Sequence, residues 1–208
     1  MKSLRLMLSV VLISIAAAAF AQTDAPKTDA QKSDVQQTNV PKTEAQKSFE
    51  QLKSLAGTWE GSVAMDEQLH EHAKGAPEKL QVSLRVTSRG NALVHEMGDL
   101  NRSDDPTKHD HPVTMFYLDG GQLILTHYCD AGNRPRMTAK VSEDGKKIEF
   151  DFLDVSGSTQ YGHMQHAVFT IIDANHHTEE WTYLLPGDKR MSGRMDLHRV
   201  RTQQASVR

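Results

Sequence analysis

The sequence predicts an all-β protein, an up-and-down antiparallel β-barrel of about ten strands preceded by one short helix. From residue 58 onward, apolar and polar residues alternate with a period of two, which is typical of strands with one buried face. Short clusters of Gly, Asp, Asn and Pro separate the alternating runs and favour hairpin turns. No crossover helix is expected between runs, so successive strands should pair antiparallel, and closure removes the sheet edges.

The N-terminal residues 1–21 have the pattern of a signal peptide. Lys2 and Arg5 precede an apolar run, and residues 19–21 form an A-x-A cleavage site. We therefore expect an exported protein, periplasmic or secreted, whose mature chain begins at Gln22. No other apolar run approaches the length of a membrane span, so no spanning helix is expected.

Charge and cysteine content narrow the class of protein further. The 208-residue chain has a net charge of −3, and losing the two signal-peptide cations gives −3 − 2 = −5. A weakly acidic protein lacks the basic surface that nucleic acid requires, so no nucleic-acid partner is expected. Cys129 is the only cysteine, so the chain has no internal disulfide and must be stabilised by a packed core. Cys129 itself is expected to be a small buried residue.

Residues 22–47 are polar and of low complexity. TDAPKTDAQKS (23–33) recurs as TNVPKTEAQKS (38–48), with eight of eleven positions identical. Such a segment buries too little apolar surface to offset its ordering entropy, so a disordered linker is expected. A tether to the cell wall or another surface is the functional alternative.

One short helix is expected at the start of the folded domain, which we place at 48–201 with a C-terminal tail at 202–208. Ser48 and Gln51 match a capping box, and Gly57 is expected to end the helix. The apolar residues on one face are Phe49, Leu52, Leu55 and Ala56.

Ten strands are expected after the helix, each bounded by turn residues. Their predicted ranges are 58–65, 79–87, 91–100, 113–118, 122–128, 136–142, 147–153, 163–172, 177–184 and 192–200.

The opening of the domain, LAGTWEG (55–61), resembles the start of lipocalin-like proteins, in which a helical turn leads into G-x-W on the first strand. The resemblance implies that Trp59 lies at the closed end of the barrel under an arginine from the last strand. Either Arg199 or Arg201 would be that arginine, stacked on the indole in a cation–π contact.

Three further segments, 111–137, 162–173 and 178–183, resemble a family of secreted bacterial lipocalin-like domains of uncharacterised function. The likeness covers roughly residues 50–201. It implies the barrel fold and little about activity.

The segment LTHYCDAGNRPRM (125–137) is expected to be a hairpin at the barrel rim. His127 interrupts an apolar strand face, and a polar residue on a buried face needs a partner. We expect His127 to face the lumen, with Cys129, Arg136 and Met137 nearby and Arg136 anchoring an acidic or polar ligand group. An arginine that pairs with Asp130, or whose aliphatic stem packs along an apolar wall, is the alternative.

Other ligand-binding candidates come from neighbouring strands: His95, Glu96, His163, His166 and Trp181. His163 and His166 are three apart in a strand and should face opposite sides, so they are not expected to share a metal.

The remaining histidine clusters, at 70–72, 109–111 and 176–177, are interpreted as solvated loops, and no metal site is predicted. No cofactor is predicted either. Haem is the one alternative, with His127, His163 or His198 as its axial ligand.

We therefore expect a binding protein for a small apolar or amphipathic molecule, with no catalytic residues. A barrel hydrolase or isomerase using His127 with Glu96 or Glu180 is one alternative, and a structural or interaction domain with a filled barrel is another. An enzyme needs a histidine and a carboxylate within hydrogen-bond reach in the cavity, whereas a binder needs an apolar lumen with few polar anchors.

Overall fold

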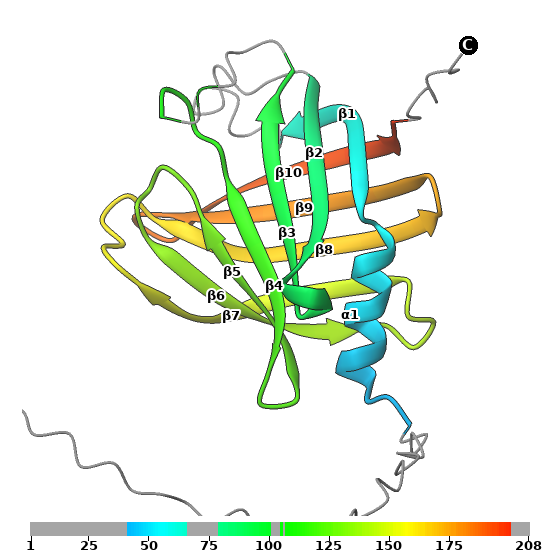
Figure 1. The fold of residues 1–208 in the computed structure, drawn as a ribbon. Coiled ribbons are helices and arrows are strands. Elements are labelled where there is room, and N and C mark those ends of the chain that lie inside the picture. The colour runs from blue at the N-terminus through cyan, green and yellow to red at the C-terminus, as the bar shows by residue number, and fades with distance from the viewer. Residues whose placement is uncertain (1–40, 66–78, 101–104, 106, 201–208) are drawn as a thin grey trace, which may run out of the picture. The chain divides into compact units, whose positions relative to one another are not determined.

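The computed structural model describes residues 41–65, 79–100, 105 and 107–200, and these form one helix and a closed ten-stranded barrel (Figure 1). The elements are α1 (Glu44–Ser54), β1 (Gly57–Met65), β2 (Lys79–Thr87), β3 (Ala92–Asp99), β4 (Val113–Asp119), β5 (Gln122–Tyr128), β6 (Arg134–Val141), β7 (Lys147–Ser156), β8 (His163–Asp173), β9 (His176–Leu185) and β10 (Lys189–Arg199), with a 3₁₀ turn at Ser88–Gly90.

Every strand pairs antiparallel with its neighbour in the sequence, and β1 pairs with β10 to close the barrel. The predicted fold class is therefore confirmed. Two strands, β2 and β5, have the predicted bounds, and the others differ by up to three residues at an end. The alternation that predicted the strands also sets which side chains face the lumen.

The helix begins earlier than predicted. Thr43, not Ser48, is the N-cap, and its side chain forms a capping box with Gln46. The same sequence pattern occurs at both places, but Ser48 lies inside the helix, where its hydroxyl donates to the carbonyl of Glu44. Residues 44–47 of the predicted linker are therefore part of the helix.

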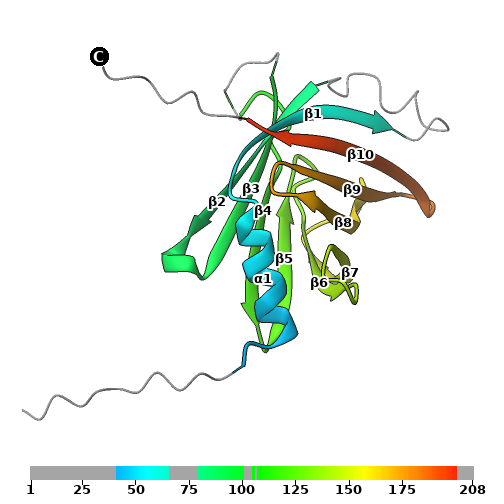
Figure 2. The ribbon, with the colours of Figure 1, turned by 90° about the vertical axis from the view of Figure 1, so that its right-hand side faces the viewer.

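The helix lies across one end of the barrel, as the two views show together (Figures 1 and 2). It contacts β2, β4 and β5, and its buried Phe49 and Leu52 extend the barrel core. Trp59, at the start of β1, is fully buried at this end and donates its indole N–H to the carbonyl of Leu55. This end of the barrel is thus closed.

The half of the barrel next to the helix is filled with side chains. Phe116, Phe150 and Phe169 pack against one another with ring centres 5.4 to 6.0 Å apart. Leu93, Leu125, Met137 and Ile148 complete this buried layer. Any open volume must therefore lie toward the other end.

The predictions for residues 1–40, for the histidines at 70–72 and for Arg201 and the tail lie outside the described residues. Within the described part of the chain, no helix is long and apolar enough to cross a membrane.

Candidate ligand-binding site

A cavity of about 850 Å³ occupies the barrel end opposite α1. It is bordered where β1 and β3 end and where β2 and β10 begin, by residues such as Met65, Leu80, Met97 and Met191. A volume of this size is in the range of small-molecule sites.

Methionine dominates the walls of this cavity. Met65, Met97, Met164, Met191 and Met195 all border it, with Val63 and Leu80 between them. Methionine side chains are flexible and polarisable, so a wall built from them adapts to apolar molecules of different shapes. The walls therefore favour apolar ligands and can adapt to ligands of more than one shape.

His127 and Trp181 line the deep part of the cavity, and we call this pair the floor. Their ring centres are 5.3 Å apart. His127 Nδ1 lies 2.8 Å from the hydroxyl of Thr114, its cross-strand neighbour on β4, and the two share a hydrogen bond. His127 Nε2 is buried and has no partner. The floor therefore holds one unsatisfied polar atom.

Burial holds this imidazole in the neutral state. Desolvation, with a smaller electrostatic effect of His95, lowers the pKa of His127 from 6.5 to about 3. A neutral imidazole whose Nδ1 is hydrogen-bonded can offer Nε2 as a donor or an acceptor, depending on the tautomer. The atom suits a neutral polar group better than an ion.

Glu179 on β9 lies beneath the floor and accepts hydrogen bonds from the N–H groups of three side chains. His95 Nε2 donates to both carboxylate oxygens, at 2.9 and 3.1 Å, and His177 Nε2 donates at 3.0 Å. The indole of Trp181 donates to the same carboxylate at 3.0 Å. All four side chains come from β3 and β9, and we call them the Glu179 cluster.

The Glu179 cluster holds a carboxylate anion inside the barrel. Complete burial would raise the pKa of Glu179, but attraction to His95 and hydrogen bonds from His177 and His95 outweigh it and hold the pKa well below its usual range. His177 also packs edge-on against Trp59, with ring centres 4.2 Å apart. The cluster thus links the closed end to the floor and fixes Trp181 in place.

The rim of the cavity is polar and mainly acidic. Glu96, Asp99, Asp105, Asp110 and Asp130 border it. Burial raises the pKa of Asp110, although the carboxylate accepts a hydrogen bond from the backbone of Asp130. Desolvation likewise raises the pKa of the Cys129 thiol and raises that of Tyr183 to about 12. Cys129 is therefore a thiol rather than a thiolate at neutral pH, which does not suit nucleophilic catalysis.

Four of the candidates from the sequence border the cavity: Glu96, His127, Cys129 and Trp181. His95 lies one layer deeper, fully buried against Glu179. His127 faces the lumen at the border of this cavity, and its contact with a ligand stays a prediction.

The other four candidates do not border the cavity. Arg136 lies on the outer face, where its Nε donates to Asp154 at 2.9 Å, so it cannot anchor a ligand in the lumen. Met137 is a fully buried core residue. His163 packs against Phe152, and His166 pairs with Asp151 at 3.1 Å. None of these four side chains therefore borders this cavity.

Sequence reasoning missed Glu179 and His177, although a signal was present. His177, Glu179 and Trp181 are spaced by two along one strand, so all three share the face on which Trp181 was placed. Of the three histidines considered for haem, His127 alone borders the cavity, whereas His163 packs against Phe152 and His198 pairs with Asp196.

Comparisons with known proteins support the fold and add no function. No family model and no curated protein matches the sequence. The structure is similar to that of Rv2717c from M. tuberculosis, with a TM-score of 0.52, 12% identity and coverage of 74% of this chain and 98% of that one. A Nostoc punctiforme protein of unknown function from the DUF3598 family has a TM-score of 0.45 at 9% identity, covering 72% of this chain and 49% of that one.

Proposed function

We propose that this protein is an exported binding protein whose barrel cavity takes a small, largely apolar molecule that makes one hydrogen bond to His127. The observation that carries the proposal is that His127, which borders the cavity, has a buried Nε2 with no partner. A buried polar atom without a partner costs about 1–3 kcal/mol, which a ligand group at the floor would recover.

Among the residues that the structure describes, the charges at the cavity disfavour anionic ligands. His127 is neutral, and the carboxylates at the rim repel negative charge at the entrance. Arg136, the cation expected to attract an acid, lies outside the lumen. Neutral or cationic amphipathic molecules, rather than fatty acids, therefore fit the site.

The geometry favours binding over the hydrolase or isomerase alternative. His127 Nδ1 pairs with Thr114 and its Nε2 has no partner, so no carboxylate activates this imidazole. Glu180 lies on the outer face and pairs with Arg194. Inside the barrel, His95 and Glu179 do form a histidine–carboxylate pair, but both are fully buried below the floor. Neither His127 nor the buried His95–Glu179 pair therefore offers a ligand the general acid–base pair that catalysis requires.

A matched pair of ligands tests the proposal. 1-Naphthol and naphthalene differ by one hydroxyl, and each can be titrated as a competitor of the neutral fluorescent probe N-phenyl-1-naphthylamine. The fluorescence of this probe rises when it enters an apolar environment, so its intensity reports occupation of the cavity. Wild-type protein should bind both ligands, and each should displace the probe.

The hydroxyl preference should depend on His127. In His127→Phe, the affinity ratio of 1-naphthol to naphthalene should fall by about two- to tenfold, the equivalent of one net hydrogen bond. Arg136→Ala is the matched control and should leave both affinities unchanged. An unaltered ratio in His127→Phe, or no displacement of the probe by either ligand, would overturn the proposal.

A further inference from the structure

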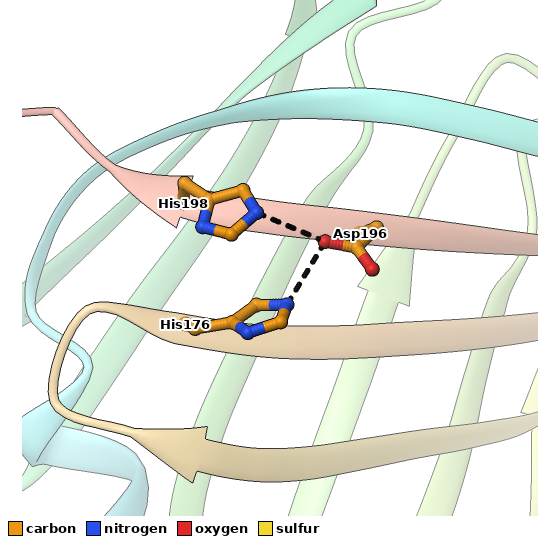
Figure 3. A group of neighbouring side chains, drawn as sticks. All are labelled: His176, Asp196 and His198. Atoms are coloured by element: carbon orange, nitrogen blue, oxygen red, sulfur yellow. Dashed lines mark hydrogen bonds and ion pairs between the residues drawn. The ribbon is translucent and has the colours of Figure 1, made fainter.

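Two histidines and an aspartate meet on the outer face of the barrel, away from the cavity. His176 begins β9, and His198 lies near the end of β10 as its cross-strand partner. Asp196 precedes His198 by two residues and so shares its face of the sheet. Figure 3 shows both imidazoles directed at the carboxylate.

The three side chains are close enough to act together. His176 Nε2 lies 2.9 Å and His198 Nε2 lies 3.3 Å from the same oxygen, Asp196 Oδ1. The two imidazole rings are stacked, with centres 4.2 Å apart and an angle of 21° between their planes. The three possible ligand atoms, one from each residue, all lie within 4.8 Å of one another.

These distances are near those that a tetrahedral metal site requires. Bonds of about 2.0–2.1 Å to a tetrahedral ion place ligand atoms about 3.3–3.4 Å apart. The two nitrogen–oxygen distances already match this spacing to within half an ångström. Binding needs the two imidazoles to approach the ion by small rotations and to carry their remaining protons on Nδ1.

We propose that His176, Asp196 and His198 bind a divalent transition metal of the zinc class. Two imidazole nitrogens and one carboxylate oxygen form a donor set that zinc accepts, with water in the fourth position. The same set would take Co²⁺, Ni²⁺ or Cu²⁺ when one of these is supplied, in the usual order of affinity.

The location suggests what the ion does. It joins the start of β9 to the end of β10, beside Arg199, the residue that covers Trp59 at the closed end. Since β10 also pairs with β1 to close the barrel, a link at this point holds the closing strand in register. Metal binding should therefore stabilise the folded barrel, because the unfolded chain does not hold the three ligands together.

Zinc titration by isothermal calorimetry of the metal-free full chain tests the site. Wild-type protein should bind zinc with one site per chain, and His176→Gln or His198→Gln should each weaken that site at least tenfold. His166→Gln is the matched control, because His166 also pairs with an aspartate on the outer face but lacks a second histidine. A paired His109→Gln/His111→Gln variant controls for binding at the cavity rim.

The melting temperature and the absorption spectrum of bound Co²⁺ distinguish a defined metal site from weak binding at the surface. Zinc should raise the melting temperature of the wild type and both controls, but not of His198→Gln. Co²⁺ should give the intense visible absorption of a four-coordinate site, and zinc should remove it. Far-UV circular dichroism of the metal-free variants checks the fold, and the exposed position of His198 makes disruption unexpected. Retained zinc binding in both His176→Gln and His198→Gln, or its loss in either control, would overturn the proposal.

Discussion

The guanidinium of Arg199 stacks on the indole of Trp59, with its carbon 4.1 Å from the ring centre. The same side chain donates to the backbone carbonyls of Ser54, Ala56 and Ala174. Gly57 has a φ of +143°, and a Cβ there would lie 2.5 Å from the guanidinium. One arginine thus joins the helix, the β8–β9 turn and the first strand, and glycine is the residue that leaves room for it.

Replacing Arg199 should destabilise the barrel more than replacing an ordinary surface arginine. Arg199→Ala should lower the free energy of unfolding by about 2–4 kcal/mol, because it removes a cation–π contact and three hydrogen bonds from a charged donor. Arg194→Ala, which breaks an exposed ion pair with Glu180, should cost less than about 1 kcal/mol. Urea unfolding measures both. Equal losses in the two variants would show that Arg199 does not close the barrel.

The buried Glu179 carboxylate should be required for stability. Glu179→Gln leaves His95 and His177 without their anionic acceptor and should cost about 3–5 kcal/mol, the range for breaking a buried ion pair. Glu180→Gln changes the neighbouring residue on the outer face and should cost less than about 1 kcal/mol. Thermal and urea unfolding of the two variants provide the comparison. If Glu179→Gln barely changes the free energy of unfolding, the hydrogen-bond network does not need the negative charge.

Alternation along the chain was sufficient to predict the barrel, because each strand needs only its own residues to show which face is buried. Alternation could not show whether Arg199 or Arg201 covers Trp59. It depends on the pairing of β1 with β10, in which Trp59 is opposite Arg199. The structure therefore decides a question that the resemblance left open.

The prediction for Arg136 was wrong for a related reason. Arg136 is the partner of Thr126, whereas Met137 is the partner of Leu125, which shares the inward face with His127. A shift of one residue in the register of a hairpin moves a side chain to the opposite face of the sheet. The turn at Asp130–Asn133 does not fix that register, so the sequence could identify the hairpin but not the direction of Arg136.

The proposed metal ligands were beyond sequence reasoning for the same physical cause. His176 and His198 are 22 residues apart and become neighbours only through the register of β9 and β10. Spacing rules find ligands within one helix or turn, and these ligands belong to different strands. His176 was accordingly interpreted as part of a solvated loop.

The stability of the protein should decrease as the pH falls below about 6.5, and His127 should account for part of the decrease. The pKa of His127 is 6.5 when unfolded and about 3 when folded, so between these values the unfolded state binds one more proton. Unfolding therefore becomes easier as the pH falls, by up to about 1.4 kcal/mol per pH unit and by about 5 kcal/mol in total between pH 6.5 and 3.

His127→Gln tests this contribution, because glutamine does not titrate while the Glu179 cluster remains in both proteins. Urea unfolding at a series of pH values from about 7 to 4 should show a shallower dependence for the variant. The two slopes should differ by close to one proton per molecule. Parallel curves would show that His127 is not held neutral in the folded barrel.

Cys129 provides a direct probe of whether the cavity is occupied. It is the only cysteine, it is half-buried, and it borders the cavity. Because burial raises its thiol pKa, iodoacetamide should modify it several-fold more slowly in the folded protein at neutral pH than in urea.

Saturating 1-naphthol should slow the reaction of the folded protein further and leave the reaction in urea unchanged. The mass of the intact chain measures the extent of modification, since one thiol gives one adduct. If 1-naphthol binds but does not protect Cys129, the ligand lies outside this cavity, because a molecule filling it would cover the wall that contains the thiol.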